Sequence, residues 1–467
     1  MKSPKKLLLA SRSFTLFDQN IFAKFSGDFN PIHLDHIFAR RTISGQCIVH
    51  GIHGLMWALE SLLCQINIAP SAICVRFLKP IFLNEEVDCI YYKNLKKIKI
   101  VKNSIIFTDI SLKFDSNVDK SNFSLNYNTV LKFPLDREIN DLINLEDQEF
   151  SYRGNIDLAT SFFPNLSDFY SISSCCEIAA ISEIIGMQIP GLHSLILSAS
   201  INFQRKNINP KFSIVSIDER FNLVKILIDA SSITCNIDCF LRQKPTNSAP
   251  LIDLKMMVKD SEFRNIKALI VGGSRGLGES VAKLIAVGGG ESVVTYSVGY
   301  DDCLKLSKDI SSIGRKCSIV KIQIPEDIHL LNELGDFNQI YYFPTPKIFG
   351  KRSINYDENL YLNFYEIYVN SFKLLVNTFT KSSIKTSIFY PSSAAISSPL
   401  VELAEYIDAK IEGEFLCKEL SKFPNISILV SRIPRTRTDQ TMSLINVKSE
   451  NPEDVMLPIV REMTSLN

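Results

Sequence analysis

Residues able to do chemistry gather in one short stretch near the N-terminus, FSGDFNPIHLDHIFARRTISGQCIVHG, which spans residues 25–51. This stretch places a carboxylate, Asp28, five residues before an imidazole, His33, and it ends on His50-Gly51. A carboxylate and an imidazole can hold one water between them and remove its proton. Gly51 would begin a helix, so its N–H would lie at the helix N-terminus. The partial positive charge of that end favours an oxygen that is gaining negative charge. These residue types predict that water is added to, or removed from, an activated carbonyl compound.

The elements that must position these residues are a helix and a sheet. Apolar residues recur at the helical period in IHGLMWALESLLC, which predicts a helix with one buried face over residues 51–64. Runs rich in Ile, Val, Phe and Tyr follow, separated by turn residues, as expected of antiparallel strands. Residues 1–135 are therefore predicted to wrap a sheet around one central helix.

The motif SGD-x-NP-x-H, followed by His-Gly at the start of the central helix, resembles the MaoC-like, (R)-specific enoyl thioester hydratases, which have the hot-dog fold. The resemblance implies that Asp28 and His33 handle the water and that Gly51 binds the thioester oxygen. The alternative is that Asp28 caps a turn and His33 is a loop histidine. His36 and Asp35 could be taken for metal ligands with His33, but no further ligand cluster supports a metal, so none is expected.

A second helix followed by strands occupies residues 150–260, after a polar linker over residues 136–155. The order of elements repeats that of the first domain but lacks both Asp-x4-His and His-Gly, so a second, degenerate hot-dog domain is predicted. Its expected role is to supply core contacts and part of the acyl pocket. His193 follows the helix and could be catalytic, although a lone histidine there is more often structural.

A different pattern begins near residue 265, where IKALIVGGSRGLGESVAKLIAVGG reads as a buried strand, a glycine turn and a helix. Small residues let a pyrophosphate approach the backbone, and the helix N-terminus favours its charge. The residues of this turn predicted to bind a dinucleotide are Gly272, Ser274, Arg275, Gly276, Leu277 and Gly278.

A second set of reactive residues follows this turn. A predicted strand ends at Ser393, Tyr406 comes thirteen residues later, and Lys410 lies four residues beyond, which places both side chains on one helix face. Tyrosine holds its proton too tightly near neutral pH, with an unperturbed pKa of about 10. A nearby ammonium would lower that pKa. Ser393 would bind the substrate carbonyl, and Asn370 could carry a proton relay towards Lys410.

The pattern GGSRGLG with Ser-x12-Tyr-x3-Lys and Asn370 resembles the short-chain dehydrogenase/reductases, particularly the ketoacyl-thioester reductases, over residues 265–445. The second predicted strand of this domain ends in Tyr296-Ser297 without an acid that would bind the ribose of NAD. Arg275 could instead meet a 2′-phosphate, so NADP(H) is the expected cofactor; alternatively, Arg275 only faces solvent. The chain departs from the family at YYFPTP (residues 341–346), which replaces Asn-Asn-Ala-Gly, at Ile324, which replaces an adenine-binding acid, and at Pro434-Arg435, which replaces Pro-Gly.

The whole chain is thus predicted to be an α+β double hot dog followed by an α/β, Rossmann-type, doubly wound parallel sheet over residues 265–467. Its net charge of +1 predicts no attraction to nucleic acid, and no apolar run has the length of a membrane span. Eleven cysteines without CxxC pairs predict reduced thiols and a cytoplasmic location. The N-terminal MKSPKKLLLA is expected to be too short for a secretory signal, and the final SLN is not a peroxisomal address.

The two predicted activities share a compound, because a hydratase and a ketoacyl reductase both handle a 3-hydroxyacyl thioester. A bifunctional enzyme acting on acyl-CoA or acyl-carrier-protein thioesters is therefore the leading prediction. A homodimer or tetramer is expected from the resemblance. One alternative is a reductase of a sugar or other small carbonyl compound, with hot dogs that only bind an acyl group. Another is a non-catalytic scaffold module of a fatty-acid or polyketide assembly.

Overall fold

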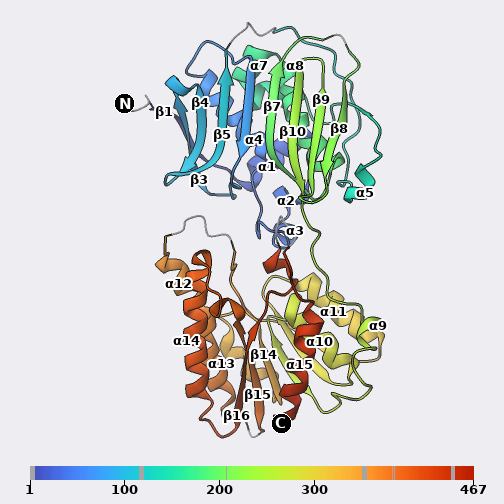
Figure 1. Cartoon of the computed structure of the whole chain (residues 1–467), viewed down its shortest axis with the longest axis vertical. Coiled ribbons are helices and arrows are strands. Elements are labelled where there is room, and N and C mark those ends of the chain that lie inside the picture. The colour runs from blue at the N-terminus through green and yellow to red at the C-terminus, as the bar shows by residue number, and fades with distance from the viewer. Residues whose placement is uncertain are drawn as a thin grey trace. The chain divides into compact units, whose positions relative to one another are not determined.

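Two compact units make up the described part of the chain in this computed structural model (Figure 1). The first unit runs to Lys244 and the second begins at Pro245. Both predicted hot-dog domains therefore lie in one unit. The described residues are 6–114, 120–206, 208–349, 355–380, 382, 384–442 and 447–466.

A ten-stranded sheet organises the first unit, with the order β1-β3-β4-β5-β2-β7-β10-β9-β8-β6. All its pairings are antiparallel. Its strands are β1 (Lys6–Ser13), β2 (Ala72–Phe77), β3 (Glu86–Tyr92), β4 (Lys97–Lys102), β5 (Ile105–Lys113), β6 (Gln148–Glu149), β7 (Ser194–Phe203), β8 (Lys211–Asp218), β9 (Leu223–Asp229) and β10 (Ile233–Leu241).

The sheet consists of two halves with the same order of elements. Read inward from each edge, the strands run β1-β3-β4-β5-β2 and β6-β8-β9-β10-β7. The halves join where β2 pairs with β7, with Val75 opposite Ala199. In each half a helix precedes four strands, so the sequence repeat has a structural counterpart.

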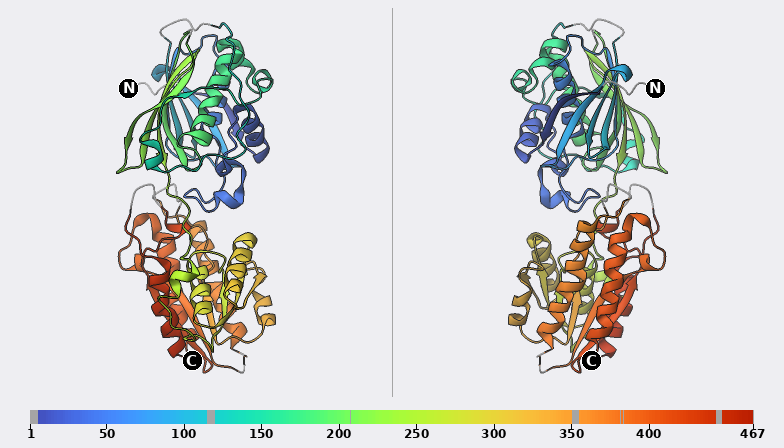
Figure 2. Two further views of the ribbon diagram at one scale, coloured as in Figure 1. Left: turned by 90° about the vertical axis from the view of Figure 1, so that its right-hand side faces the viewer. Right: turned by 90° about the vertical axis from the view of Figure 1, so that its left-hand side faces the viewer.

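Helices of the first unit gather on one side of this sheet (Figure 2). The central helix α4 (Gly51–Leu63) was predicted to have one buried face, but all its residues except Gly51 and Glu60 are buried. The reason is that α7 and α8 pack against α4 in addition to the sheet. The other helices are α1 (Leu16–Ser26), α2 (Pro31–Leu34), α3 (His36–Ala39), α5 (Ile139–Leu142), α6 (Leu158–Phe162), α7 (Pro164–Tyr170) and α8 (Ile172–Glu183), which continues into the π-helical turn η2 (Ile184–Gln188).

A six-stranded parallel sheet organises the second unit, with the order β13-β12-β11-β14-β15-β16. The chain thus starts at the centre, moves to one edge and then returns to build the other edge, as in dinucleotide-binding sheets. The strands are β11 (Lys267–Val271), β12 (Glu291–Tyr296), β13 (Cys317–Lys321), β14 (Gln339–Tyr342), β15 (Thr386–Ser393) and β16 (Ile426–Ile433).

Helices cover both faces of the parallel sheet (Figure 2). Alternate residues of β11 enter different cores: Leu269 packs into one and Ile270 into the other. Such alternation follows from the period of a strand buried on both faces. The helices are α9 (Leu251–Leu254), α10 (Gly276–Val287), α11 (Tyr300–Ser312), α12 (Glu358–Tyr365), the π-helical turn η4 (Glu366–Ser371), α13 (Phe372–Phe379), α14 (Ala404–Leu420) and α15 (Pro452–Ser465).

Short 3-10 turns complete the described elements: η1 (Lys93–Leu95), η3 (Ile328–Leu334), η5 (Ala394–Ile396), η6 (Val401–Leu403) and η7 (Asp439–Thr441). No single helix of the described residues has the length and apolar character needed to cross a membrane. One strongly bent pair, α7 with α8–η2, meets those criteria by length and composition alone.

Candidate active site

Asp28 is held in a buried position by the end of α1. Gly27 closes that helix with a left-handed backbone (φ 86°) and bonds back to Ala23. The next residue, Asp28, donates its backbone N–H to Ser26 Oγ at 3.1 Å, and only 1% of Asp28 is exposed. The sequence SGD therefore forms a helix end that turns a carboxylate into the protein interior.

The second half of the sheet unit contributes to the surroundings of this carboxylate. Ser182, on α8, donates its hydroxyl to Asp28 Oδ2 at 2.7 Å, and the backbone N–H of Asn30 donates to Oδ1 at 3.0 Å. A Cβ on Gly186 would lie 2.6 Å from Oδ1, so only glycine leaves room for the carboxylate. Burial raises the pKa of Asp28 to about 6, although both hydrogen bonds favour the ionised form.

His33 is oriented by a short helix and by one backbone carbonyl. Asn30 caps α2 through its side-chain oxygen, and its amide donates to the Gly186 carbonyl at 2.7 Å. His33 Nδ1 lies 2.8 Å from the carbonyl oxygen of Ile48. A carbonyl only accepts, so Nδ1 carries the proton and Nε2 presents a lone pair. Burial lowers the pKa of His33 to about 4, which keeps the ring neutral at pH 7.

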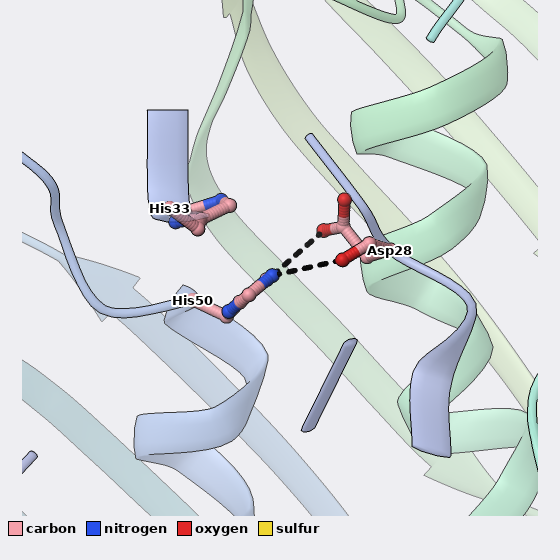
Figure 3. A group of neighbouring side chains, drawn as sticks. All are labelled: Asp28, His33 and His50. Atoms are coloured by element: carbon pink, nitrogen blue, oxygen red, sulfur yellow. Dashed lines mark hydrogen bonds and ion pairs between the residues drawn. The ribbon is translucent and has the colours of Figure 1, made fainter. Parts of the chain in front are cut away.

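His50 is a third member of the group, drawn with Asp28 and His33 in Figure 3. Its ring stacks on that of His33, with the centroids 3.8 Å apart. His50 Nε2 lies 3.1 Å from the Asp28 carbonyl oxygen and 3.8 Å from Asp28 Oδ2. Gln19 Oε1 accepts the backbone N–H of His50 and lies 2.8 Å from Nδ1. Burial holds the pKa of His50 well below its usual value.

The side chains of Asp28, His33 and His50 come close enough together to share one small ligand. The nearest side-chain atoms of Asp28, His33 and His50 all lie within 4.8 Å of one another. A water hydrogen-bonded to two partners separates them by about 4.6 Å. The group can therefore hold one water at hydrogen-bonding distance.

Gly51 begins α4, so its N–H is among the first four of the helix, which have no partner within it. A Cβ on Gly51 would approach the ring of Phe77 to 3.1 Å. The helix start therefore combines close packing with a backbone donor next to His50.

The other candidate side chains near this site have structural partners. Asp35 caps α3 by accepting from the backbone of Ile37 at 2.8 Å, and His36 is exposed. His193 is buried, and its Nε2 lies 3.5 Å from Asp136 Oδ1. None of these three belongs to the group formed by Asp28, His33 and His50.

In the second unit, the glycine turn joins β11 to α10. Gly272 and Gly276 have left-handed backbones (φ 73° and 60°), and α10 begins at Gly276. A Cβ on Gly278 would lie 2.6 Å from the Cα of Gly273, so the helix can approach the turn only without a side chain there. Ser274 and Leu277 are partly buried within the same turn.

Two features of the chain modify this turn. The segment after β14 packs on it, because a Cβ on Gly272 would lie 3.0 Å from the nitrogen of Pro344. Arg275, predicted to meet a 2′-phosphate, forms an ion pair of 2.8 Å with Asp439. The alternative that Arg275 only faces solvent is therefore wrong, and its charge is balanced by a carboxylate.

Ser393, Tyr406 and Lys410 lie close to one another, at the end of β15 and on α14. A hydrogen bond with Ser393 favours the ionised form of Tyr406, but burial outweighs it and raises the pKa of Tyr406. This is opposite to the predicted lowering by Lys410. Lys410 Nζ lies 5.9 Å from the Tyr406 ring centroid and donates to the Pro391 carbonyl at 2.7 Å. Burial lowers the pKa of Lys410 to about 7.

Asn370 does not face Lys410, which corrects the prediction of a relay through it. Its side chain is exposed and donates to Glu366 Oε2 at 2.7 Å. The π-helical turn η4 instead directs Tyr368 inward, where Lys410 Nζ lies 3.6 Å from its ring centroid. The hydroxyl of Tyr368 hydrogen-bonds with Thr345 Oγ1 at 2.5 Å.

The part of the chain that contains Asp28, His33 and His50 resembles a known protein family. Residues 4–110 match the family described as MaoC like domain. This part of the chain is therefore similar to that family. A comparison with curated proteins found no match.

Solved structures similar to the remainder of the chain include short-chain dehydrogenases. One is a short-chain dehydrogenase/reductase from Serratia marcescens (15% identity, 43% of this chain and 91% of that chain, TM-score 0.39). Another is a putative short chain dehydrogenase from Pseudomonas syringae (18% identity, 44% and 91%, TM-score 0.38). A third is a short chain dehydrogenase from Burkholderia cenocepacia in complex with NADP (15% identity, 43% and 91%, TM-score 0.39).

Sequence analysis missed several residues that surround Asp28. Ser182 and Gly186 come from the second half of the sheet unit, and Ser182 is 154 positions from Asp28. Their small size, one helical turn apart, was the only signal in the sequence. His50 was noticed only as the residue before Gly51, although its place in IVHG beside the motif could have drawn attention to it.

Proposed function

We propose that this chain is a bifunctional enzyme of acyl-thioester metabolism, with a double hot dog that adds or removes water and a Rossmann-type reductase domain. The observation that carries the proposal is the placement of Asp28 and the neutral His33 within reach of one water, next to the helix start at Gly51. The repeat in the ten-stranded sheet supports the double hot dog. The strand order of the parallel sheet supports the Rossmann-type domain.

For hydration, a single water donates two hydrogen bonds. One goes to the Asp28 carboxylate and the other goes to His33 Nε2. At pH 7 Asp28 is mostly ionised and His33 is neutral, so both accept. As the water oxygen attacks C3 of a 2-enoyl thioester, Asp28 takes the proton and can return one to C2. Dehydration of the (R)-3-hydroxyacyl thioester runs through the same steps in reverse.

The thioester oxygen gains negative charge when C3 is attacked. The Gly51 N–H at the α4 N-terminus is placed to donate to that oxygen. Removing one such donor typically costs about 10²–10³-fold in rate. Together, Asp28 and His33 hold the water and move its proton, and Gly51 supplies the oxyanion donor.

For reduction, the residues present fit a nicotinamide dinucleotide. The left-handed Gly272 and Gly276 leave the start of α10 open to a pyrophosphate, and Gly278 keeps the helix close. The tip of β12 carries Tyr296 and Ser297 and not an acid that would bind the ribose of NAD. This favours NADP(H). Arg275 would bind the 2′-phosphate only by giving up part of its contact with Asp439. When bound, the cofactor would supply hydride to C3 of a 3-oxoacyl thioester.

Proton delivery in this reaction belongs to the chain's own residues. Ser393 hydrogen-bonds the substrate carbonyl, and Tyr406 gives that oxygen its proton. Tyr406 enters the reaction protonated, because burial raises its pKa. A charged Lys410 stabilises the phenolate that remains, and the ring of Tyr368 favours that charge.

A second candidate keeps the hydratase and gives the second unit no reductase activity. The observation that favours it is the modified glycine turn, where Asp439 neutralises Arg275 and Pro344 packs on Gly272. In this case the second unit would be a scaffold. Titration of the full chain with NADPH in a thermal-shift experiment separates the candidates, because only a dinucleotide-binding unit gains stability.

Two assays test the leading proposal. Hydration of crotonyl-CoA by the full chain tests the first site, and oxidation of NADPH in the presence of acetoacetyl-CoA tests the second. We expect both reactions. Hydration that persists unchanged in the Asp28→Asn variant would remove the hydratase assignment, and acetoacetyl-CoA reduction that persists in Tyr406→Phe would remove the reductase assignment.

A further inference from the structure

Arg242 is a buried guanidinium that forms no ion pair with a carboxylate of the described residues. It directly follows β10, and 4% of it is exposed. Its Nε donates to the Ser194 carbonyl at 3.3 Å and its Nη2 donates to the Leu192 carbonyl at 3.1 Å. Among the described residues its Nη1 has no hydrogen-bond partner. Burial alone lowers the pKa of Arg242 to about 10, so the side chain remains charged at pH 7.

Hydrogen bonds connect Arg242 with the residues that position His33. The Leu192 carbonyl that accepts from Nη2 also accepts from Asn30 Nδ2 at 3.3 Å. Asn30 caps the helix that carries His33. The charge of Arg242 also helps to lower the pKa of His33. One carbonyl therefore connects the guanidinium with the residue that caps the helix of His33.

His193 adds a second unsatisfied polar atom to the same neighbourhood. Its backbone carbonyl accepts from the Arg242 N–H at 2.8 Å. His193 is 3% exposed, and its Nδ1 has no partner among the described residues. Buried polar atoms are nearly always paired, and a buried charge without a counter-charge is costly. Two such atoms, on residues joined by a backbone hydrogen bond, indicate a place for a ligand that carries negative charge.

We infer that Arg242, with His193 beside it, binds a carboxylate on the acyl chain of the thioester substrate, close to the carbon that receives water. The inference rests on the proposed hydratase function and adds a substrate class to it: short enoyl thioesters that end in a carboxylate. Arg242 Nη1 donates to the carboxylate.

A phosphate would satisfy the same donors, but its place in the substrate argues against it. In coenzyme A and in carrier proteins the whole pantetheine arm separates the thioester from the phosphate. Arg242 shares the Leu192 carbonyl with Asn30, which caps the helix of His33, and His33 acts on the acyl side of the thioester. An anion next to both groups must therefore belong to the acyl chain.

The test compares succinyl-CoA with butyryl-CoA by calorimetric titration of the full chain. These ligands have acyl chains of the same length and differ in a terminal carboxylate or methyl group. Neither contains a C2–C3 double bond, so neither can be hydrated. We expect succinyl-CoA to bind at least about tenfold more tightly. Arg242→Met should remove this preference without changing the affinity for butyryl-CoA, and Arg242→Lys should retain part of it.

Each other outcome contradicts the inference. Equal affinities of the wild-type chain for the two ligands would overturn it, even if Arg242→Met failed to fold. An equal loss for both ligands in Arg242→Met would indicate a phosphate contact or a structural role. Hydration of crotonyl-CoA, measured in parallel, separates failure of this inference from failure of the proposed function: turnover without a preference for succinyl-CoA removes only the inference.

Discussion

The two candidate sites differ in how their acid–base groups are supported. In the first, Asp28 accepts two hydrogen bonds and the His33 tautomer is set by the Ile48 carbonyl. In the second, the ammonium of Lys410 rests on the ring of Tyr368 and on a backbone carbonyl, and the predicted Asn370 points outward. The first site follows its sequence motif closely, while the second keeps the reacting residues and changes their supports.

This difference shows at which site a short sequence motif is sufficient to determine the geometry. In the first site the spacing within residues 26–33 fixes one helix end and one short helix, so the local fold delivers the geometry. In the second, the supports come from η4 and from the segment after β14, where the chain departs from the family pattern. Changes at each site should therefore have different consequences.

The largest effect is expected from Asp28→Asn, which removes the base of the first site. Hydration of crotonyl-CoA should fall by about 10³-fold, because an amide cannot accept the proton from water. The rate is followed by loss of the enoyl thioester absorbance. Asp35→Asn is the matched control, since asparagine caps a helix as well as aspartate does. Equal rates in the two variants would contradict the assignment.

A similar but smaller loss is expected at the second site from Tyr406→Phe. Reduction of acetoacetyl-CoA should fall by about 10²-fold or more, because no group remains to give the carbonyl oxygen its proton. Oxidation of NADPH is the measurement. Tyr300→Phe, at a half-exposed position at the start of α11 in the same unit, serves as the control and should reduce at the wild-type rate.

Tyr368→Leu and Asn370→Ala together sharpen the comparison between motif and structure. Loss of the ring that contacts Lys410 should lower reduction about thirtyfold at pH 7, because a desolvated cation–π contact is worth about 2 kcal/mol. Asn370→Ala should stay within about twofold of wild type, since its side chain is exposed. The reverse order of effects would restore the relay through Asn370.

Ser182→Ala tests the support of Asp28 from the second half of the first unit. Asp28 must be ionised to take a proton, so hydration should fall as the pH drops through its pKa of about 6. The Ser182 hydroxyl favours the ionised form, so its loss raises this pKa and moves the acid limb to higher pH. A severalfold lower rate at pH 6, with little change at pH 8, is expected. Ser174→Ala, on the same helix and bonded to the Tyr170 carbonyl, should leave the profile unchanged.

The sequence predicted the order of elements and most of the reacting residues because both depend on short-range patterns. Glycines at a turn, apolar periods and the spacing of Tyr406 and Lys410 act within a few residues of one another. Ser182, Gly186 and Arg242 reach the first site only through packing between segments far apart in the chain. The inward turn of Tyr368 depends on a π-helical turn, which has no period that the sequence reveals. The direction of the Tyr406 pKa depended on burial, which outweighed the hydrogen bond with Ser393.

The central claim is that both units process one 3-hydroxyacyl thioester in succession. The most direct test is mass spectrometry of products after the full chain is incubated with acetoacetyl-CoA and NADPH. We predict (R)-3-hydroxybutyryl-CoA together with crotonyl-CoA, and accumulation of the hydroxy compound alone in the Asp28→Asn variant. Crotonyl-CoA formed equally by that variant, or no reduced product from the wild-type chain, would contradict the account.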